Sequence, residues 1–413
     1  MYNARTKGFK MIELNKIYQA KQKIADFALK TPLSHSHFLS DICNAKIYLK
    51  NENLQRTGAY KIRGAYNKIA NLSESQKKNG VIAASAGNHA QGVAISAKNF
   101  GIKSTIVMPE STPLLKVSAT KNLGAEVILK GDNFDESYDF AIKYAKKNNM
   151  SFIHPFEDDL VIAGQGTVML EMLDDINDLD AVLVPVGGGG LISGVASAAK
   201  QINPDIKIVG VSAKGAPAMY ESYKNKKIKN SKSVRTIADG IAVRDVNAKN
   251  LDIILECVDD FVQVDDEEIA EAVLFLLEKH KIIVEGAGAA SVAALLHKKM
   301  KFKKDSKIAA ILSGGNIDVQ MLNIIIEKGL FKAHRKMQIM VTLIDKPGAL
   351  LDLTDSLKKA NANIVKIDYD RFSTKLDYGD AMISITLETK GFEHQEDLRK
   401  ILKEKAYKFS EIL

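Results

Sequence analysis

The sequence predicts an α/β protein with parallel sheets covered by helices, followed by a smaller α+β unit. Two observations lead to this prediction. Short apolar runs alternate with helical patterns up to about residue 330, which is typical of βαβ units and a parallel sheet. After that point the order becomes strand, helix, strand, strand, helix, strand, which is the order of a compact βαββαβ unit.

The elements of the larger part follow from the spacing of their apolar residues. Strands are expected where four to six apolar residues lie between turn residues, at 46–49, 81–84, 104–108, 126–129, 181–185, 207–212 and 308–312. Helices are expected where apolar residues recur every three to four positions, at 11–29, 58–72, 90–100, 114–123, 134–147, 191–202, 265–279 and 287–300.

The tail beyond residue 330 contains a clear turn signal, Asp345-Lys346-Pro347-Gly348. Around it we expect strands at 338–344, 363–372 and 380–387, helices at 349–360 and 394–405, and a weak last strand.

Three loops rich in small residues follow expected strands, at the edge where parallel sheets bind ligands. They are Ser85–His89, Gly187–Leu191 and Ser313–Asn316. A lysine, Lys61, lies among small residues at the start of an expected helix.

Each of these features also has a simpler explanation. The run Gly187–Gly190 forms either an anion cup of backbone N–H groups or a tight turn. It is not a dinucleotide fingerprint, since Ser193 stands where the last glycine of that motif belongs. Asn88 is equally a helix cap, Ser313 a strand-ending turn and Lys61 a surface charge.

The joint occurrence of these features favours pyridoxal phosphate. Lys61 offers an amine for a Schiff base, the glycines offer bare backbone for a phosphate, and Ser313 offers a hydroxyl for a pyridine nitrogen. A neutral hydroxyl can donate to that nitrogen without protonating it.

Composition excludes several other classes of protein. A hydrophobic content of 46% and a charged content of 26% are ordinary for a globular enzyme. The net charge is +8, but the lysines are spread singly, so we expect no nucleic-acid binding. The uncharged stretch 181–199 contains Pro185 and four glycines, so we expect a strand and a helix there and no membrane span. Two distant cysteines and a polar segment 1–10 indicate a cytoplasmic protein without a signal peptide.

Six motifs together resemble the fold-type II pyridoxal-phosphate enzymes, and within them the threonine ammonia-lyases. The motifs are Tyr60-Lys61-Ile62-Arg63-Gly64-Ala65, Ser85-Ala86-Gly87-Asn88-His89-Ala90-Gln91-Gly92, His154-Pro155-Phe156, Ala163-Gly164-Gln165-Gly166-Thr167, Thr236-Ile237-Ala238-Asp239-Gly240-Ile241-Ala242-Val243 and Ser313-Gly314-Gly315-Asn316. The resemblance implies a two-lobed catalytic core of the tryptophan-synthase-β-like type over 1–330, with a small lobe at about 46–150 inserted in the large one.

The resemblance also implies a role for each site residue. Lys61 would bind the cofactor aldehyde, Asn88 its ring hydroxyl and Ser313 its ring nitrogen, while Tyr60 and Gly240 would enclose the ring. The phosphate would lie on Gly187, Gly188, Gly189, Gly190 and Leu191. The substrate carboxylate would lie on the backbone of Ser85, Ala86, Gly87, Asn88 and His89.

The implied reaction removes water and then ammonia from L-threonine, with L-serine as a further substrate. Lys61 would take the Cα proton, and the product would be 2-oxobutanoate, the first intermediate of isoleucine biosynthesis. Serine racemases of this fold carry a serine where this chain has Ala86, so we expect little racemisation.

Three departures from the family pattern stand out. Tyr60 replaces the usual phenylalanine, Ser212 replaces a glutamate of a cation site, so no metal is expected, and only Arg244 remains of an arginine-rich segment.

The tail, 331–413, resembles an ACT domain, a type that pairs its sheets and binds small amino acids. Gly348, Leu350 and Asn363 would lie near the effector, for which isoleucine is the expected feedback inhibitor. A homo-oligomer, either dimer or tetramer, is expected because such sheets have edges to pair. The alternative is a purely stabilising or dimerising domain.

Other functions stay open at this point. A serine dehydratase, a serine racemase, a β-replacement synthase and a catabolic threonine dehydratase share the fold. An amino-acid sensor would be a different class, and Lys61 argues against it, because a sensor needs no Schiff-base amine beside a phosphate cup.

Overall fold

The computed structural model describes residues 11–374 and 376–412. The segment 1–10, which carries the expectation about a signal peptide, lies outside the described residues. The chain forms two compact units, Met1–Asp318 and Val319–Leu413, and the helix that follows Asp318 belongs to the second unit.

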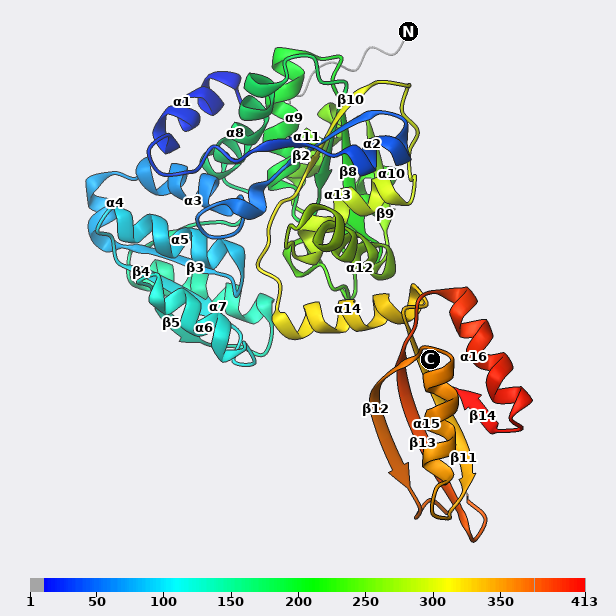
Figure 1. The fold of residues 1–413 in the computed structure, drawn as a ribbon. Coiled ribbons are helices and arrows are strands. Elements are labelled where there is room, and N and C mark those ends of the chain that lie inside the picture. Colours follow the sequence, from blue (N-terminus) through cyan, green and yellow to red (C-terminus); the bar gives the residue numbers. More distant parts are fainter. Residues whose placement is uncertain (1–10, 375, 413) are drawn as a thin grey trace. The chain divides into compact units, whose positions relative to one another are not determined.

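A six-stranded sheet forms the centre of the large lobe of the first unit (Figure 1). Its strands, in spatial order, are β1 (Leu33–His35), β2 (Lys46–Lys50), β10 (Lys307–Ile311), β7 (Ala181–Pro185), β8 (Lys207–Ala213) and β9 (Asp260–Val264). All neighbours are parallel except β1 and β2. β2, at the start of the segment expected in the small lobe, therefore pairs with β10 in the large sheet.

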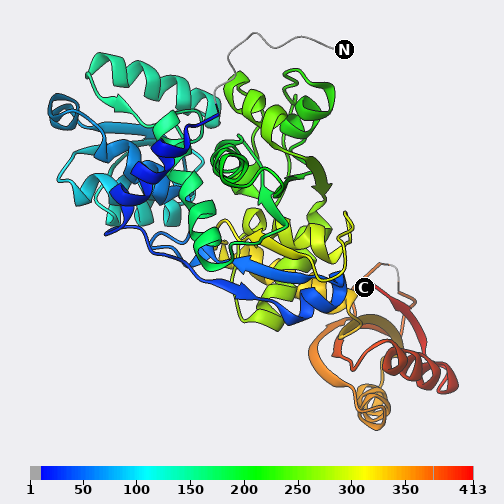
Figure 2. The ribbon, with the colours of Figure 1, turned by 90° about the horizontal axis from the view of Figure 1, so that it is seen from above.

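The small lobe is built on a separate sheet of four parallel strands, which Figure 2 shows with its covering helices in blue and cyan. The strands, in spatial order, are β5 (Glu126–Leu129), β4 (Ser104–Met108), β3 (Val81–Ala84) and β6 (Ser151–Phe152). β3 and β4 are buried along their whole length, because helices cover both faces of the sheet.

Helices connect the strands of both sheets. In the first half of the unit they are α1 (Leu14–Ile24), α2 (His37–Cys43), η1 (Glu52–Leu54), α3 (Lys61–Ala70), α4 (Glu74–Asn79), α5 (Asn88–Asn99), α6 (Leu114–Asn122), α7 (Phe134–Lys147) and α8 (Asp159–Asp175). In the second half they are α9 (Gly190–Ile202), α10 (Ala218–Asn225), η2 (Asp239–Ile241), α11 (Ala248–Cys257), α12 (Asp266–Phe275), η3 (Leu276–His280) and α13 (Gly286–Leu296).

Glycines allow three helices of this unit to pack closely. A Cβ on Gly164 of α8 would lie 2.6 Å from the Arg63 carbonyl oxygen of α3. A Cβ on Gly194 of α9 would lie 2.4 Å from the Ile162 carbonyl oxygen of α8. Because real Cβ atoms do not approach so closely, only glycine permits these crossings, and α3 is held at a fixed distance from α8.

The second unit contains α14 (Val319–Lys332) and a four-stranded antiparallel sheet in the order β12, β13, β11, β14. Along the chain the elements run β11 (Lys336–Ile344), α15 (Ala349–Lys359), β12 (Asn363–Asp370), β13 (Asp380–Glu388), α16 (Phe392–Glu404) and β14 (Lys408–Glu411). Alternate residues of β11 and β13 form its core with Leu353 and Leu398. The fold class expected from the sequence, a parallel α/β core followed by a βαββαβ unit, is confirmed.

Residues 181–199 form β7, a glycine turn and most of α9, as expected. Among the residues that the structure describes, we find no helix with both the length and the apolar character to cross a lipid bilayer.

Candidate active site

Lys61 is the first residue of α3, and its side chain points into the protein. Its Nζ atom donates a hydrogen bond to the carbonyl oxygen of Pro155 over 2.9 Å. Burial lowers the pKa of Lys61 from 10.5 to about 8, and the nearby Glu285 carboxylate offsets only part of that effect. An appreciable fraction of the amine is therefore neutral near pH 7, as a nucleophile or a base requires.

A buried ion-pair network holds α3 in place. The Arg63 guanidinium bonds Glu52 on one side, at 2.8 Å, and Glu171 of α8 on the other, at 2.6 Å. Lys50 of β2 also reaches Glu171, at 2.6 Å. Arg63 follows Lys61 by two residues, so this network connects the lysine to both the large sheet and α8.

The glycine loop lies at the carboxyl end of β7, where α9 begins. Gly189 has a φ of +86° and precedes the first helical residue, Gly190. The first N–H groups of a helix have no acceptor within the helix, so they are available to an anion. Leu191 is 3% exposed and packs in the core, so only its backbone can serve a ligand.

The glycine loop packs against Phe156. A Cβ on Gly188 would lie 2.6 Å from the Phe156 ring. Asn250 donates to the carbonyl oxygens of Gly188 and Phe156, at 2.6 and 2.8 Å. Phe156 adjoins Pro155, the hydrogen-bond acceptor of Lys61, so the loop and the lysine belong to one site.

Asn88 begins α5, and its amide is held from two sides. Its Nδ2 atom donates to Glu285 Oε1 over 2.7 Å. Its Oδ1 atom accepts from Asn316 Nδ2 over 2.8 Å. Burial raises the pKa of Glu285 to about 7.

The loop expected to receive the substrate carboxylate leads into the same helix. The Ser85 hydroxyl accepts from the Gly87 N–H at 3.2 Å. His89 is buried, and its Nε2 donates to the Ile153 carbonyl at 2.8 Å. Burial, with Lys61 nearby, lowers the pKa of His89 to about 3, so its ring stays neutral. Ala86 lies between them and is partly exposed.

Ser313 lies beside the lysine segment. Its carbonyl oxygen accepts from the Tyr60 N–H at 3.1 Å, and Gly314 forms a bridge with Ala59. Burial raises the pKa of the Tyr60 hydroxyl, so it stays protonated. A Cβ on Gly240 would lie 3.0 Å from Glu285 Oε1. The structure thus brings the residues expected around the ring into one neighbourhood.

Sequence reasoning missed three contributors to this neighbourhood. Glu285 stands before a run of small residues and resembles a helix cap, and its partner Asn88 is 197 positions away. Asn316 closes a recognised motif but had no role, and Pro155 contributes only a carbonyl. The one available signal was the carboxylate at the start of an apolar helix.

The residues present fit pyridoxal phosphate. The donor set contains a buried amine with a pKa near 8, helix N–H groups for a dianion, an amide and a neutral hydroxyl. The hydroxyl of Ser193, in the first turn of α9, is buried and has no hydrogen-bond partner within the described chain.

No group of three or more histidine, cysteine, aspartate or glutamate side chains suited to a metal ion occurs in the described part of the chain. Ser212, at the position considered for a cation, is buried in β8, and its hydroxyl has no partner there. Both cysteines, Cys43 and Cys257, are free thiols.

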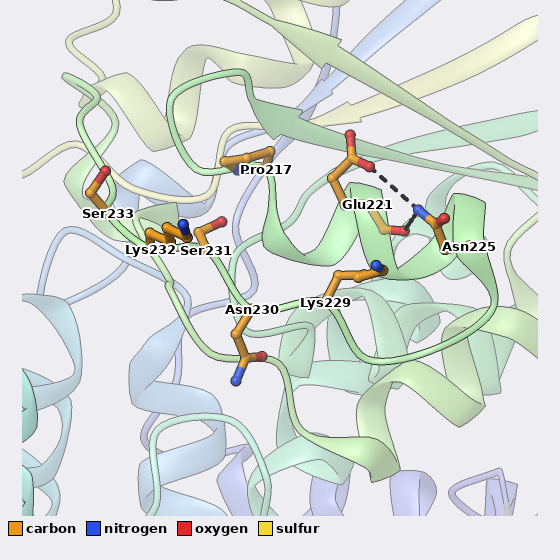
Figure 3. A pocket seen from close by; sticks show the side chains of 8 residues that line it. All are labelled: Pro217, Glu221, Asn225, Lys229, Asn230, Ser231, Lys232 and Ser233. Atoms are coloured by element: carbon orange, nitrogen blue, oxygen red, sulfur yellow. Dashed lines mark hydrogen bonds between the residues drawn. The ribbon is translucent and has the colours of Figure 1, made fainter.

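A separate hollow of about 450 Å³ lies beside α10 (Figure 3). Its lining residues are Pro217, Glu221, Asn225, Lys229, Asn230, Ser231, Lys232 and Ser233. Asn225 donates to the carbonyl oxygen of Glu221 over 2.7 Å. None of the site residues expected from the sequence lines this hollow.

In the second unit, the expected effector residues lie at the ends of elements. Gly348 has a φ of +89° and precedes α15, with open space where a side chain would extend. Leu350 packs partly on the core of the unit. Asn363 begins β12, and its amide donates to Glu388 over 2.8 Å.

The chain is similar to known pyridoxal-phosphate enzymes along most of its length. Residues 24–314 match the family model described as pyridoxal-phosphate dependent enzyme. An L-threonine ammonia-lyase of Thermotoga maritima is 47% identical over 397 residues, which is 96% of this chain and 98% of that protein. The catabolic L-threonine dehydratase TdcB of Staphylococcus aureus strain N315 is 47% identical over 323 residues, 78% of this chain and 93% of that protein.

Solved structures with the same fold include maize serine racemase, with a TM-score of 0.74 and 36% identity, covering 79% of this chain and all of that one. The processed threonine deaminase isoform 2 of Solanum lycopersicum has a TM-score of 0.71 and 36% identity, covering 78% of this chain and 93% of that one.

Proposed function

The chain belongs to the family of pyridoxal-phosphate-dependent enzymes, and from that membership we propose that it converts L-threonine to 2-oxobutanoate and ammonia. The observation that carries the proposal is the match to an L-threonine ammonia-lyase along 96% of this chain. The site geometry supports it, because a buried amine stands near a glycine loop whose backbone N–H groups at the start of α9 can hold an anion.

When bound, pyridoxal phosphate supplies an aldehyde for amines and an electron sink beside the substrate Cα. Lys61 would hold the aldehyde carbon, and the N–H groups of Gly187–Leu191 would hold the phosphate. Asn88 would donate to the ring oxygen, and the Ser313 hydroxyl would face the ring nitrogen. Tyr60 and Gly240 would lie on the ring faces.

This chain's own residues then handle the substrate. Backbone N–H groups of Ser85–His89 would orient the carboxylate of L-threonine or L-serine. The neutral amine of Lys61, favoured by its lowered pKa, would remove the Cα proton at Nζ. Loss of the β-hydroxyl as water and hydrolysis of the resulting enamine give the keto acid and ammonia.

We further propose a biosynthetic role with feedback inhibition by isoleucine through an ACT domain at residues 331–413. Support comes from the βαββαβ order of the second unit and from the full-length match to the Thermotoga protein. The matched S. aureus enzyme is named a catabolic dehydratase and is 47% identical to this chain over 323 residues, so a catabolic role is the alternative. We also propose a cytoplasmic homo-oligomer, in keeping with the free thiols and the open edges of the tail sheet.

A serine racemase is the second candidate, since maize serine racemase shares the fold. Ala86 argues against it. Alanine has no proton to deliver to the substrate face opposite Lys61.

The test is release of 2-oxobutanoate from L-threonine by the purified protein, with and without L-isoleucine. Turnover that isoleucine suppresses would support both proposals. Lys61→Ala should lower turnover by ~10⁴-fold or more. A cofactor-loaded protein that forms no 2-oxobutanoate would contradict the threonine proposal and direct attention to β-replacement chemistry.

A further inference from the structure

Glu285 is a carboxylate in the candidate active site to which no function has been assigned. It stands immediately before α13, and its N–H donates to the Gly314 carbonyl at 3.1 Å. Its side chain accepts no hydrogen bond from the N–H groups of α13, so it is not there to cap that helix. It is directed instead toward Asn88.

The hydrogen bonds around Asn88 determine the orientation of its amide. Above its pKa of about 7 the Glu285 carboxylate can only accept, so the group that faces it is the Asn88 NH₂. The Asn88 oxygen then faces the NH₂ of Asn316 at 2.8 Å. A flipped amide would bring oxygen against carboxylate and NH₂ against NH₂. In the observed orientation, one N–H of Asn88 remains for a third partner.

The backbone leaves room for this pair of side chains. A Cβ on Gly314 would lie 2.5 Å from Glu285 Oε1 and 3.1 Å from Asn88 Nδ2. A Cβ on Gly240 would lie 3.0 Å from the same carboxylate oxygen. Gly314 in turn bridges Ala59, two residues before Lys61. The pair is thus enclosed by the segments that form the cofactor site.

We propose that Glu285 is a positioning residue, which fixes the Asn88 amide so that its remaining N–H points to the ring oxygen of pyridoxal phosphate. The inference rests on the proposed contact between Asn88 and the ring. Glu285 itself touches neither substrate nor cofactor in this assignment; it acts through Asn88, and Asn316 holds the other end of the amide.

The charges around Glu285 come from several elements. Burial is the main cause of the raised pKa of Glu285, and Asp239 of η2 adds to it, while the hydrogen bond from Asn88, Lys116 of α6 and the backbone N–H of Asn316 lower it. Its carboxylate offsets part of the lowering that burial causes in the pKa of Lys61, and it adds to the raising that burial causes in the pKa of Tyr60. A change of charge at Glu285 should therefore be detectable in the titration of the bound cofactor.

The test measures cofactor binding without substrate. Pyridoxal phosphate is removed from the purified protein and added back, and its dissociation constant and absorbance spectrum are recorded from pH 6 to 9. Glu285→Ala should weaken binding ~10-fold, the effect of losing one charge-assisted hydrogen bond. Glu285→Gln should restore affinity to within ~3-fold, because its amide oxygen still accepts from Asn88, while the pH dependence of the spectrum changes.

A double-mutant cycle distinguishes positioning from general structural damage. If Glu285 acts through Asn88, then Glu285→Ala should add little in an Asn88→Ala background. Additive effects would overturn the proposal, as would wild-type affinity in Glu285→Ala. Asp265→Asn is the matched control, since Asp265 is an acidic residue at the start of the adjacent α12 and should leave binding unchanged.

Three further outcomes bear on the proposal. If Glu285→Ala does not fold, Asn316→Ala removes the other arm of the clamp and should also weaken binding in a manner not additive with Asn88→Ala; full affinity there would refute the clamp. Wild-type affinity in Asn88→Ala would refute the contact on which the proposal rests. A protein that binds the cofactor normally but does not deaminate threonine would contradict the proposed function and leave this inference intact.

Discussion

At the scale of single residues, the chemistry depends on how far burial changes the proton affinity of Lys61. A lysine with an ordinary pKa of 10.5 is neutral in fewer than ~0.1% of molecules at pH 7. With a pKa of about 8, roughly one amine in ten is neutral at that pH. Burial of the amine is unfavourable for its charged form, and it therefore increases the fraction of the neutral, nucleophilic form.

This pKa predicts how fast the protein without cofactor takes up pyridoxal phosphate. Only the neutral amine attacks the aldehyde, so the rate should rise with pH up to about 8 and level off above it. Stopped-flow absorbance measures this rate. The control is a free lysine derivative, whose rate should still rise above pH 9. A protein rate that follows the free amine would show that Lys61 is not desolvated.

Ala86 gives a second prediction at this scale. Ala86→Ser introduces a hydroxyl in the loop expected to hold the substrate, opposite the lysine. Protonation from that side inverts the Cα centre, so D-serine formation from L-serine should rise, measured by chiral chromatography. Ala86→Gly, which adds no hydroxyl, is the control. Unchanged D-serine formation in Ala86→Ser would refute the assignment of this loop.

Distance along the sequence explains which residues of the candidate site could be predicted. Lys61, Asn88 and Ser313 lie in motifs whose neighbours are close in sequence, so their joint occurrence was visible. Glu285 could not be predicted, because its place in the site depends on a contact with Asn88 that only the folded chain creates.

At the scale of secondary-structure elements, the longest helix of the core escaped prediction. α8 is buried on nearly all sides, so it has no polar face to give a helical period. It also contains Gly164 and Gly166, which weaken the helical pattern. These glycines exist for close packing against α3 and α9, a tertiary demand that local sequence does not reveal.

The packing of α8 on α3 predicts the effect of adding one methyl group. In Gly164→Ala the new Cβ would lie 2.6 Å from the Arg63 carbonyl, so the helices must separate. The free energy of unfolding in urea should fall by about 1–3 kcal/mol, and cofactor affinity should fall because Lys61 moves with α3. Lys23→Ala, at an exposed position of α1, should change stability by less than ~0.5 kcal/mol. An unchanged free energy of unfolding in Gly164→Ala would show that α3 and α8 can move apart without loss of stability, and would contradict this prediction.

At the scale of the whole molecule, the alternation of strands and helices was predictable, but β6, β9 and α11 were missed and the pairing of the strands was not predicted. Alternating apolar runs predicted the parallel core, and the change of order near residue 330 predicted the tail. The sequence did not show that β2 joins the large sheet beside β10, because strand pairing across about 260 positions leaves no local signal. The helix α14 was also missed; it lies between the last strand of the parallel core, β10, and the first strand of the tail, β11.

Removal of residues 336–413 tests whether the tail regulates the core. This change deletes all four strands of the antiparallel sheet of the second unit, together with the hydrophobic core of that unit. The family match, residues 24–314, lies within the first unit, so under the proposed function the truncated protein should still turn over threonine. Inhibition of 2-oxobutanoate release by isoleucine should disappear, while the KM for threonine without isoleucine should stay within ~3-fold of its original value, as expected if the effector binds only the tail.

A direct binding measurement by calorimetry should likewise show that isoleucine binds to the full chain and not to the truncated protein. Isoleucine inhibition that survives the truncation would place the effector site in the core and leave the second unit with a structural role.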